Sequence, residues 1–248
     1  MQTGMTSQTD DEPTYKCPIC HDTYWKPGVD KYGRPVSVEC DCWKVRQAEK
    51  RIAESGLKDE MQEKTFKNFK AETDWQRNMK DVAIAYGKSF FEAKEKKTKL
   101  PWFVISGQPG CGKTHLCTAL CGALLNRGVP VTYMQWVTES RKLRAVANDP
   151  DFDTMLEPFI DIEVLYIDDL FKQRAHKDLN VSDAEARMLF EILNKRYFMN
   201  KATVISTEWY LESELMALDD GTFSRVYERA KGFMISVERD QSKNYRIR

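Results

Sequence analysis

The sequence lacks net charge, long apolar runs and any excess of glycine or proline. Its 38 lysines and arginines balance 38 aspartates and glutamates, so nucleic-acid binding would have to come from a local patch. No run approaches the roughly 18–20 apolar residues of a membrane span. With 12 glycines and 9 prolines in 248 residues, the chain is neither a linker nor a fibrous protein. The polar start does not resemble a targeting segment, so we expect a soluble, cytoplasmic protein without membrane contact.

Apolar runs and helical patterns divide the chain into parts. We expect a disordered tail at residues 1–14, a turn-rich module at 15–50, a helical linker at 51–62 and a large domain at 63–248. Short apolar runs typical of buried parallel strands occur at 101–106, 129–134, 163–168, 202–207 and 233–237. Helical patterns lie between them, at 115–127, 137–147, 182–199 and 211–218. This alternation predicts an α/β fold with a mainly parallel sheet flanked by helices.

Four of the seven cysteines gather in the turn-rich module. A reducing cytoplasm disfavours structural disulfides, so this cluster favours a metal site made by Cys17, Cys20, Cys40 and Cys42. Zn²⁺ takes four such ligands in a tetrahedron that leaves no open position, so the metal would be structural. His21 is an alternative ligand. The remaining cysteines are interpreted as small apolar packing residues: Cys111, Cys117 and Cys121.

A glycine-rich loop follows the first apolar run of the large domain. It reads GQPGCGKT and fits the pattern GxxxxGK[ST] at every fixed position. Its backbone N–H groups and the N-terminus of the helix after it are suited to hold phosphate oxygens. Lys113 would place a charge on the β- and γ-phosphates, and the Thr114 hydroxyl would bind Mg²⁺. The predicted nucleotide-binding residues are Gly107, Gln108, Pro109, Gly110, Cys111, Gly112, Lys113, Thr114 and His115.

Two carboxylates end the apolar run that begins at Val164. Asp168 is placed to hold Mg²⁺ together with Thr114, directly or through water. Asp169 could orient and deprotonate the water that attacks the γ-phosphate. A pair of helix-capping aspartates at a strand end is the alternative interpretation. Behind a phosphate loop at this distance, the magnesium and water roles are favoured.

Beyond these motifs, the chain resembles the DnaC/DnaI family of bacterial and phage replicative-helicase loaders. That family is a branch of the AAA+ ATPases in the IstB/DnaC superfamily. The resemblance runs from about residue 15 onward and is carried by TFKNF (65–69), YIDDLFK (166–172), LFEILNKRY (189–197), ATVISTEW (202–209), SRVYERAKGF (224–233) and NYR (244–246). It implies that residues 63–248 form an AAA+ P-loop ATPase domain, preceded by a zinc module that contacts the helicase.

The resemblance also implies roles for residues outside the phosphate loop. Arg225 matches an arginine finger, which acts in trans on the nucleotide of a neighbouring subunit. Arg229 lies one helical turn further on and is the alternate candidate. Arg246 matches the second sensor, which binds nucleotide. The first sensor falls among three residues, where many relatives carry asparagine at the last position: Ser206, Thr207 and Glu208.

We therefore expect an ATP-dependent loader that places a hexameric DnaB-type helicase on single-stranded DNA during replication initiation. It would use ATP, Mg²⁺ and Zn²⁺ and would assemble with copies of itself on the helicase. Hydrolysis should be weak and stimulated by a partner or DNA, because Asp169 is one methylene shorter than the glutamate of most AAA+ ATPases. Two alternatives stay open: an IstB-type transposition-helper ATPase, and a nucleotide-binding adaptor with little turnover.

Two basic clusters are candidates for contact with DNA. The first follows the second apolar run and comprises Arg141, Lys142 and Arg144. The second follows Asp169 and comprises Lys172, Arg174 and Lys177, with His176 among them. A solvated charged face is the alternative for each cluster. Neither is accompanied by aromatic side chains on which bases could stack.

Overall fold

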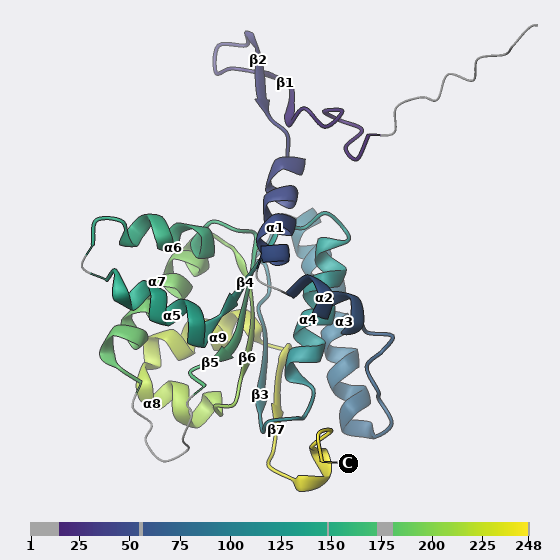
Figure 1. Cartoon of the computed structure of the whole chain (residues 1–248), viewed down its shortest axis with the longest axis vertical. Coiled ribbons are helices and arrows are strands. Elements are labelled where there is room, and N and C mark those ends of the chain that lie inside the picture. The colour runs from purple at the N-terminus through teal and green to yellow at the C-terminus, as the bar shows by residue number, and fades with distance from the viewer. Residues whose placement is uncertain (1–14, 55–56, 148, 173–180, 248) are drawn as a thin grey trace, which may run out of the picture. The chain divides into compact units, whose positions relative to one another are not determined.

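A computed structural model of the chain describes residues 15–54, 57–147, 149–172 and 181–247, which fall into two compact units (Figure 1). The first unit ends at Lys44 and the second begins at Val45. The predicted tail, residues 1–14, lies outside the described residues. The predicted module and linker meet inside helix α1 (Cys42–Glu54), and the two compact units divide near the start of the same helix.

The smaller unit is built on a hairpin of two antiparallel strands, β1 (Trp25–Val29) and β2 (Pro35–Glu39). Its turn is held by the Asp30 carboxylate, which accepts backbone N–H groups of Tyr32 at 2.8 Å and Arg34 at 2.9 Å. One pair of cysteines precedes β1 and the other follows β2. Antiparallel pairing therefore brings the two cysteine pairs to the same end of the hairpin.

The larger unit contains a five-stranded parallel sheet in the order β4-β5-β6-β3-β7. Its strands are β3 (Phe103–Gly107), β4 (Val131–Gln135), β5 (Val164–Leu170), β6 (Ala202–Thr207) and β7 (Met234–Val237). All five predicted strands are confirmed: β6 has the predicted bounds, and the ends of the others differ by at most two residues. Because β6 lies between β3 and β5, the carboxyl ends of these three strands meet at one edge of the sheet.

Helices cover both faces of this sheet (Figure 1). One face packs against α2 (Leu57–Glu63), α3 (Asp74–Glu95) and α4 (Lys113–Leu125). The other packs against α5 (Trp136–Ala145), α6 (Phe152–Ile160), α7 (Asp183–Phe198), a π-helical turn (Leu211–Leu215), α8 (Met216–Leu218) and α9 (Asp220–Ala230). Among the described residues, no helix combines the length and apolarity needed to cross a bilayer.

Alternate residues of each strand serve two separate cores, as the two-residue period of a strand requires. Phe103 and Ile105 of β3 pack with α3 and α4, whereas Val104 packs with the helices of the opposite face. Ile52 and Leu57 are buried in the same core as Phe103, so the segment predicted as a linker is helical and packs on the larger unit. Helices α6 and α9 were not among the predicted helical patterns, and Pro158 interrupts the pattern of α6.

A single arginine closes the opposite edge of the sheet, where β5 and β6 begin. Arg196 of α7 is fully buried, and its guanidinium donates to six acceptors. These are the Thr203 hydroxyl and the carbonyl oxygens of Phe159, Ile160, Ile162, Glu163 and Ala202. Burial lowers the pKa of Arg196 to about 9, so the side chain stays cationic at neutral pH. It supplies donors to buried carbonyl groups at the end of α6 and at the start of β5 and β6.

We predict that Arg196→Met lowers the free energy of unfolding by at least about 3 kcal/mol, because it leaves several buried carbonyls without donors. Urea unfolding followed by circular dichroism would measure this. Arg187→Met is the matched control, since Arg187 is exposed on the same helix, and it should change stability by less than about 0.5 kcal/mol. Equal losses in the two variants would contradict the role given to Arg196.

Candidate functional site

The phosphate loop connects β3 to α4 in a conformation that its glycines permit. Gly107 and Gly110 have φ of 124° and 76°, in the left-handed region that side chains disfavour. A Cβ on Gly107 would lie 2.1 Å from the Val237 carbonyl oxygen, and one on Gly110 would lie 2.0 Å from Asn244 Oδ1. The predicted loop is therefore specified by close backbone packing as well as by curvature.

Lys113 begins α4 and is 5% exposed. Its ammonium donates to the carbonyl oxygens of Gly107 at 2.7 Å and Gln108 at 2.8 Å. Burial lowers the pKa of Lys113. The ammonium is thus held over the loop by neutral acceptors, where a phosphate could replace those carbonyls as its partner.

The Asp168 carboxylate is surrounded by hydroxyl groups of residues on three strands and one helix. It accepts hydrogen bonds from Tyr166 at 2.8 Å, Tyr133 at 3.1 Å and Thr114 at 3.3 Å, and also from the Ser206 hydroxyl. The predicted magnesium ligands, Thr114 and Asp168, are therefore brought together. Their oxygen atoms fit the preference of Mg²⁺ for hard ligands.

Asp169 lies near the end of β5, at the irregularity between Ile167 and Leu170, and pairs with a lysine. Its backbone φ is 53°, and its N–H donates to the Ser206 hydroxyl at 3.0 Å. Its carboxylate pairs with Lys172 Nζ at 2.8 Å, and Glu208 lies 3.7 Å from the same ammonium. Lys172, which is predicted to contact DNA, therefore pairs with two carboxylates that line the same pocket as the phosphate loop.

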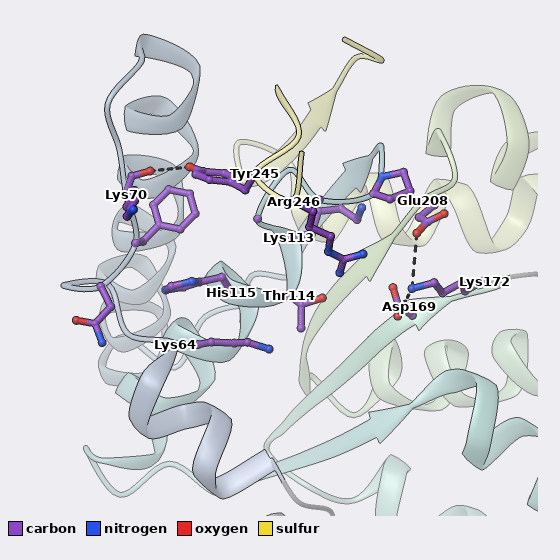
Figure 2. A pocket seen from close by; sticks show the side chains of 15 residues that line it. Lys64, Lys70, Lys113, Thr114, His115, Asp169, Lys172, Glu208, Tyr245 and Arg246 are labelled. Carbon is purple, nitrogen blue, oxygen red and sulfur yellow. Dashed lines mark hydrogen bonds and ion pairs between the residues drawn. The ribbon is translucent and has the colours of Figure 1, made fainter. Parts of the chain in front are cut away.

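A pocket of about 400 Å³ joins these groups (Figure 2). Its polar wall comes from the phosphate loop and from the residues after β5 and β6. Its other wall is aromatic, with the Phe69 ring 5.3 Å from that of His115 and 6.1 Å from that of Tyr245. The His115 ring donates from Nε2 to the Thr65 carbonyl oxygen at 2.9 Å. The pocket thus offers charges suited to phosphates beside rings suited to a base.

The segment from 238 to 247 crosses the loop and completes the pocket; we call it the C-terminal strap. Tyr245 donates through its hydroxyl to the Lys70 carbonyl at 2.6 Å and through its N–H to the Gly110 carbonyl at 2.9 Å. Gln108 and Asp240 exchange two hydrogen bonds, of 2.7 and 2.8 Å. The strap brings Arg246 into the pocket lining, beside the predicted nucleotide-binding residues.

The three candidates for the first sensor have different surroundings. The Ser206 hydroxyl is bound to Asp168. The Thr207 hydroxyl donates to the Leu170 carbonyl at 2.9 Å and accepts the Trp209 N–H. Both of these hydrogen bonds are to backbone groups near the ends of β5 and β6. Of the three candidates, only Glu208 lines the pocket, and its side chain is a carboxylate.

The two finger candidates also differ. Arg229 is 6% exposed and donates to the Asn200 side chain at 2.7 Å. Arg225 is half-buried on α9, where it donates to the Gly221 carbonyl at 2.7 Å and lies over the Phe190 ring at 5.4 Å. Arg225 is not among the residues that line the pocket, as a group acting on another subunit requires. The exposure favours Arg225 over Arg229.

The first basic cluster lies on α5. Its members Arg141, Lys142 and Arg144 are exposed. Lys142 pairs with Glu139 at 2.8 Å, and Arg144 lies 3.7 Å from Glu185. In the second cluster, Arg174 and Lys177 lie outside the described residues. Contact of either cluster with DNA stays a prediction.

The four clustered cysteines converge at the base of the hairpin. Their sulfur atoms all lie within 4.8 Å of one another, with Cys17 Sγ 3.8 Å from Cys40 Sγ and Cys20 Sγ 3.3 Å from Cys42 Sγ. A tetrahedron with Zn–S bonds of about 2.3 Å has edges of about 3.8 Å, so the donor set fits zinc. A hydrogen bond from the Cys20 backbone lowers the pKa of the Cys17 thiol to about 6, whereas burial raises the pKa of the Cys42 thiol in the same cluster.

The other sulfur and imidazole groups lie apart from this cluster. His21 is exposed and stacks on Tyr15, with ring centroids 4.6 Å apart, and is not part of the ligand group found among the described residues. The cysteines interpreted as packing residues are fully buried, and burial raises the pKa of each thiol: Cys111, Cys117 and Cys121. The packing interpretation is confirmed.

Sequence reasoning missed several members of the site. Tyr133 and Tyr166 donate hydrogen bonds to Asp168, but both lie in apolar runs that give no sign of this role. The one available sign is the two-residue spacing of Tyr166 and Asp168, which places them on the same face of a strand. Tyr245 lies in the NYR motif, yet only its neighbour Arg246 was assigned a role. Lys172 was assigned to DNA because its turn was not foreseen. The contacts of Tyr133 and Tyr245 join segments far apart in the sequence, whereas those of Tyr166 and Lys172 depend on the local backbone at the end of β5.

Comparison with known proteins agrees with this geometry. The sequence model of the family of IstB-like ATP binding proteins matches residues 36–227. The phage-like element PBSX protein XkdC of Bacillus subtilis is 29% identical over 235 residues, which cover 92% of this chain and 84% of XkdC. The replicative helicase loader DnaC of Escherichia coli is 24% identical over 174 residues, which cover 69% of this chain and 66% of DnaC.

Solved structures show the same fold. A crystal structure of the DnaC helicase loader matches with a TM-score of 0.60 at 18% sequence identity, covering 72% of this chain and 98% of that one. At this identity the likeness concerns the fold alone. The strand order, the loop after β3 and the acidic end of β5 are those of an AAA+ P-loop ATPase.

We predict that the chain binds one Zn²⁺ and that Cys17→Ser loses it to a chelator at concentrations the parent withstands, since three thiolates hold zinc less tightly than four. Elemental analysis after chelator dialysis would show this. Cys121→Ala, which removes a thiol outside the cluster, should keep its zinc. Parent protein that carries no zinc after purification in zinc-supplemented medium would contradict the assignment.

Proposed function

This chain belongs to the family of IstB-like ATP binding proteins, and we propose on that premise that it is an ATP-dependent loader of a replicative helicase. The observation that carries the proposal is the pocket in which the phosphate loop meets the acidic end of β5. Its partner would be a hexameric DnaB-type helicase, delivered onto single-stranded DNA in the cytoplasm. The named function of the relative DnaC supports this choice of partner.

The residues divide the work on ATP among themselves. The loop amides and Lys113 would bind the β- and γ-phosphates, while the rings of Phe69 and Tyr245 would flank the base. Thr114 and Asp168 would hold Mg²⁺, which neutralises phosphate charge when bound. Asp169 would accept a proton from the attacking water.

Weak basal hydrolysis would follow from the length of the Asp169 side chain. In this structure, its carboxylate is paired with Lys172 at 2.8 Å. Because aspartate is also shorter than glutamate, its reach toward the γ-phosphate is limited. Stimulation by the helicase or by single-stranded DNA would then depend on bringing a finger such as Arg225 to the pocket of a neighbouring subunit.

The small unit supports the choice of a loader. The family match begins at residue 36 and leaves out Cys17 and Cys20, so half of the cysteine cluster lies outside the shared region. A zinc-stapled module that precedes the ATPase is suited to hold a protein partner, as the DnaC/DnaI resemblance implies. The exposed basic residues of α5 would contact the DNA.

A transposition-helper ATPase is the second candidate, because the matching family is named for IstB. The two functions call for different partners: a replicative helicase or a transposase. A nucleotide-holding adaptor is distinguished from both by its lack of turnover under any stimulation.

A pull-down with the zinc-loaded chain as bait tests these functions. A replicative DnaB-type helicase should be retained, with an amount that differs between ATP and ADP, and a transposase of the IstB-partnered class should not. Asp169→Asn should retain helicase in ATP without hydrolysing it. Retention of transposase alone would favour the helper function, and full partner-stimulated turnover by Asp169→Asn would remove Asp169 from the chemistry.

We predict that Arg225→Ala binds ATP as the parent does, because it leaves its own pocket intact. Its turnover in the presence of helicase should fall by about 10³-fold, or to the unstimulated rate if that is reached first. Phosphate release, measured with and without helicase, would report both numbers. Arg187→Ala is a control that removes an exposed arginine from α7.

Mixing decides whether the arginine acts in trans. Lys113→Ala should be inactive because its own pocket no longer binds the phosphates of ATP. An equal mixture of Lys113→Ala and Arg225→Ala should regain part of the activity. In that mixture one chain supplies the finger and the other supplies the pocket. A mixture without recovery would place Arg225 outside the neighbouring site.

A further inference from the structure

Lys172 lines the same pocket as Lys113 and lies beside Asp169 and Glu208 (Figure 2). Its ammonium lies 2.8 Å from Asp169 and 3.7 Å from Glu208, and its side chain is 39% exposed. Lys113, by contrast, is bonded to two neutral carbonyls. Of the four lysines that line the pocket, Lys113 comes from the start of α4 and Lys172 from the turn after β5; the others are Lys64 and Lys70.

The turn after β5 aims Lys172 back into the pocket. Asp169 and Phe171 both have left-handed backbones, with φ of 53° and 55°, and the Lys172 N–H donates to the Asp169 carbonyl at 3.0 Å. Phe171 is 3% exposed and packs between the rings of Trp136 at 5.2 Å and Trp209 at 4.9 Å. The backbone beneath Lys172 is thus fixed, and the four-carbon side chain is the mobile part.

Two carboxylates lie beside this lysine. Asp169 and Glu208 both face the pocket in which a triphosphate would place its γ-phosphate, and like charges so close repel one another. A neutral side chain in place of Glu208 would avoid this cost. Lys172 compensates both carboxylates, and its ammonium has three N–H donors that can be redirected to phosphate oxygens.

We propose that Lys172 is a second phosphate-contacting lysine, which moves from Asp169 to the γ-phosphate of a nucleoside triphosphate. Glu208 positions it during this exchange. The movement frees the Asp169 carboxylate for water only when a triphosphate is bound, so the pocket distinguishes triphosphate from diphosphate. This inference rests on the proposed nucleotide function and gives Lys172 a role in the pocket in place of DNA contact.

The test compares affinities for ADP and for a non-hydrolysable ATP analogue, both with Mg²⁺, by titration calorimetry on the zinc-loaded full chain. Lys172→Ala should lose about tenfold or more in affinity for the analogue and stay within about twofold for ADP, because a charge-assisted contact to the γ-phosphate is removed. Unchanged ADP affinity also shows that the variant is folded. Lys195→Ala, an exposed lysine paired with Glu191 at 2.7 Å, is the matched control and should change neither affinity.

Two further variants separate positioning from simple charge. Lys172→Arg should keep most of the preference for the analogue, because it keeps the cation. Lys172→Ala combined with Glu208→Gln should recover part of the lost analogue affinity, because one uncompensated carboxylate is removed from the phosphate site. Glu208→Gln alone should change the preference less than Lys172→Ala does.

The outcomes distinguish this inference from the function on which it rests. If the parent binds neither nucleotide, or Lys113→Ala leaves both affinities unchanged, the nucleotide function fails. If those results are as expected but Lys172→Ala loses both affinities equally, or neither, the inference alone is overturned. Faster hydrolysis with unchanged analogue affinity would make Lys172 a restraint on Asp169 and would also overturn it.

Discussion

Parallel pairing of β6 with both β3 and β5 is the constraint on which the site depends. It brings the end of the phosphate-loop strand and the end of the acidic strand to one edge of the sheet, on either side of Ser206. The Ser206 hydroxyl then touches Asp168 and the backbone of Asp169 together. A shift of β6 by one residue would turn this hydroxyl to the other face and separate the groups that the chemistry needs.

The two edges of the sheet are built in different ways. Where β5 and β6 begin, Arg196 is fully buried and donates to the carbonyls around it. Where they end, charged side chains such as Asp169 and Lys172 line a pocket and pair with one another. The buried hydrogen bonds of Arg196 thus lie at one end of the strands, and the charged pocket lies at the other.

The sequence predicted those features that local pattern determines. Apolar runs located the five strands, GQPGCGKT located the loop, and paired cysteines located a cluster whose sulfur atoms do converge. It could not show that Asp169 and Phe171 have left-handed backbones beside Lys172 in the pocket lining, because these φ values are unusual for such residue types. Nor could it show that Arg196 is buried, since an arginine in an amphipathic helix is ordinarily solvated.

The C-terminal strap has a practical consequence for anyone who handles this protein. Its hydrogen bonds to Gln108, Gly110 and Lys70 make it a wall of the pocket. A tag or reporter fused directly to this strap would begin beside the phosphate loop, and a charged tag would compete with the charges already there. A label attached to the strap would therefore change the charge and the access of the same pocket whose nucleotide binding is being measured.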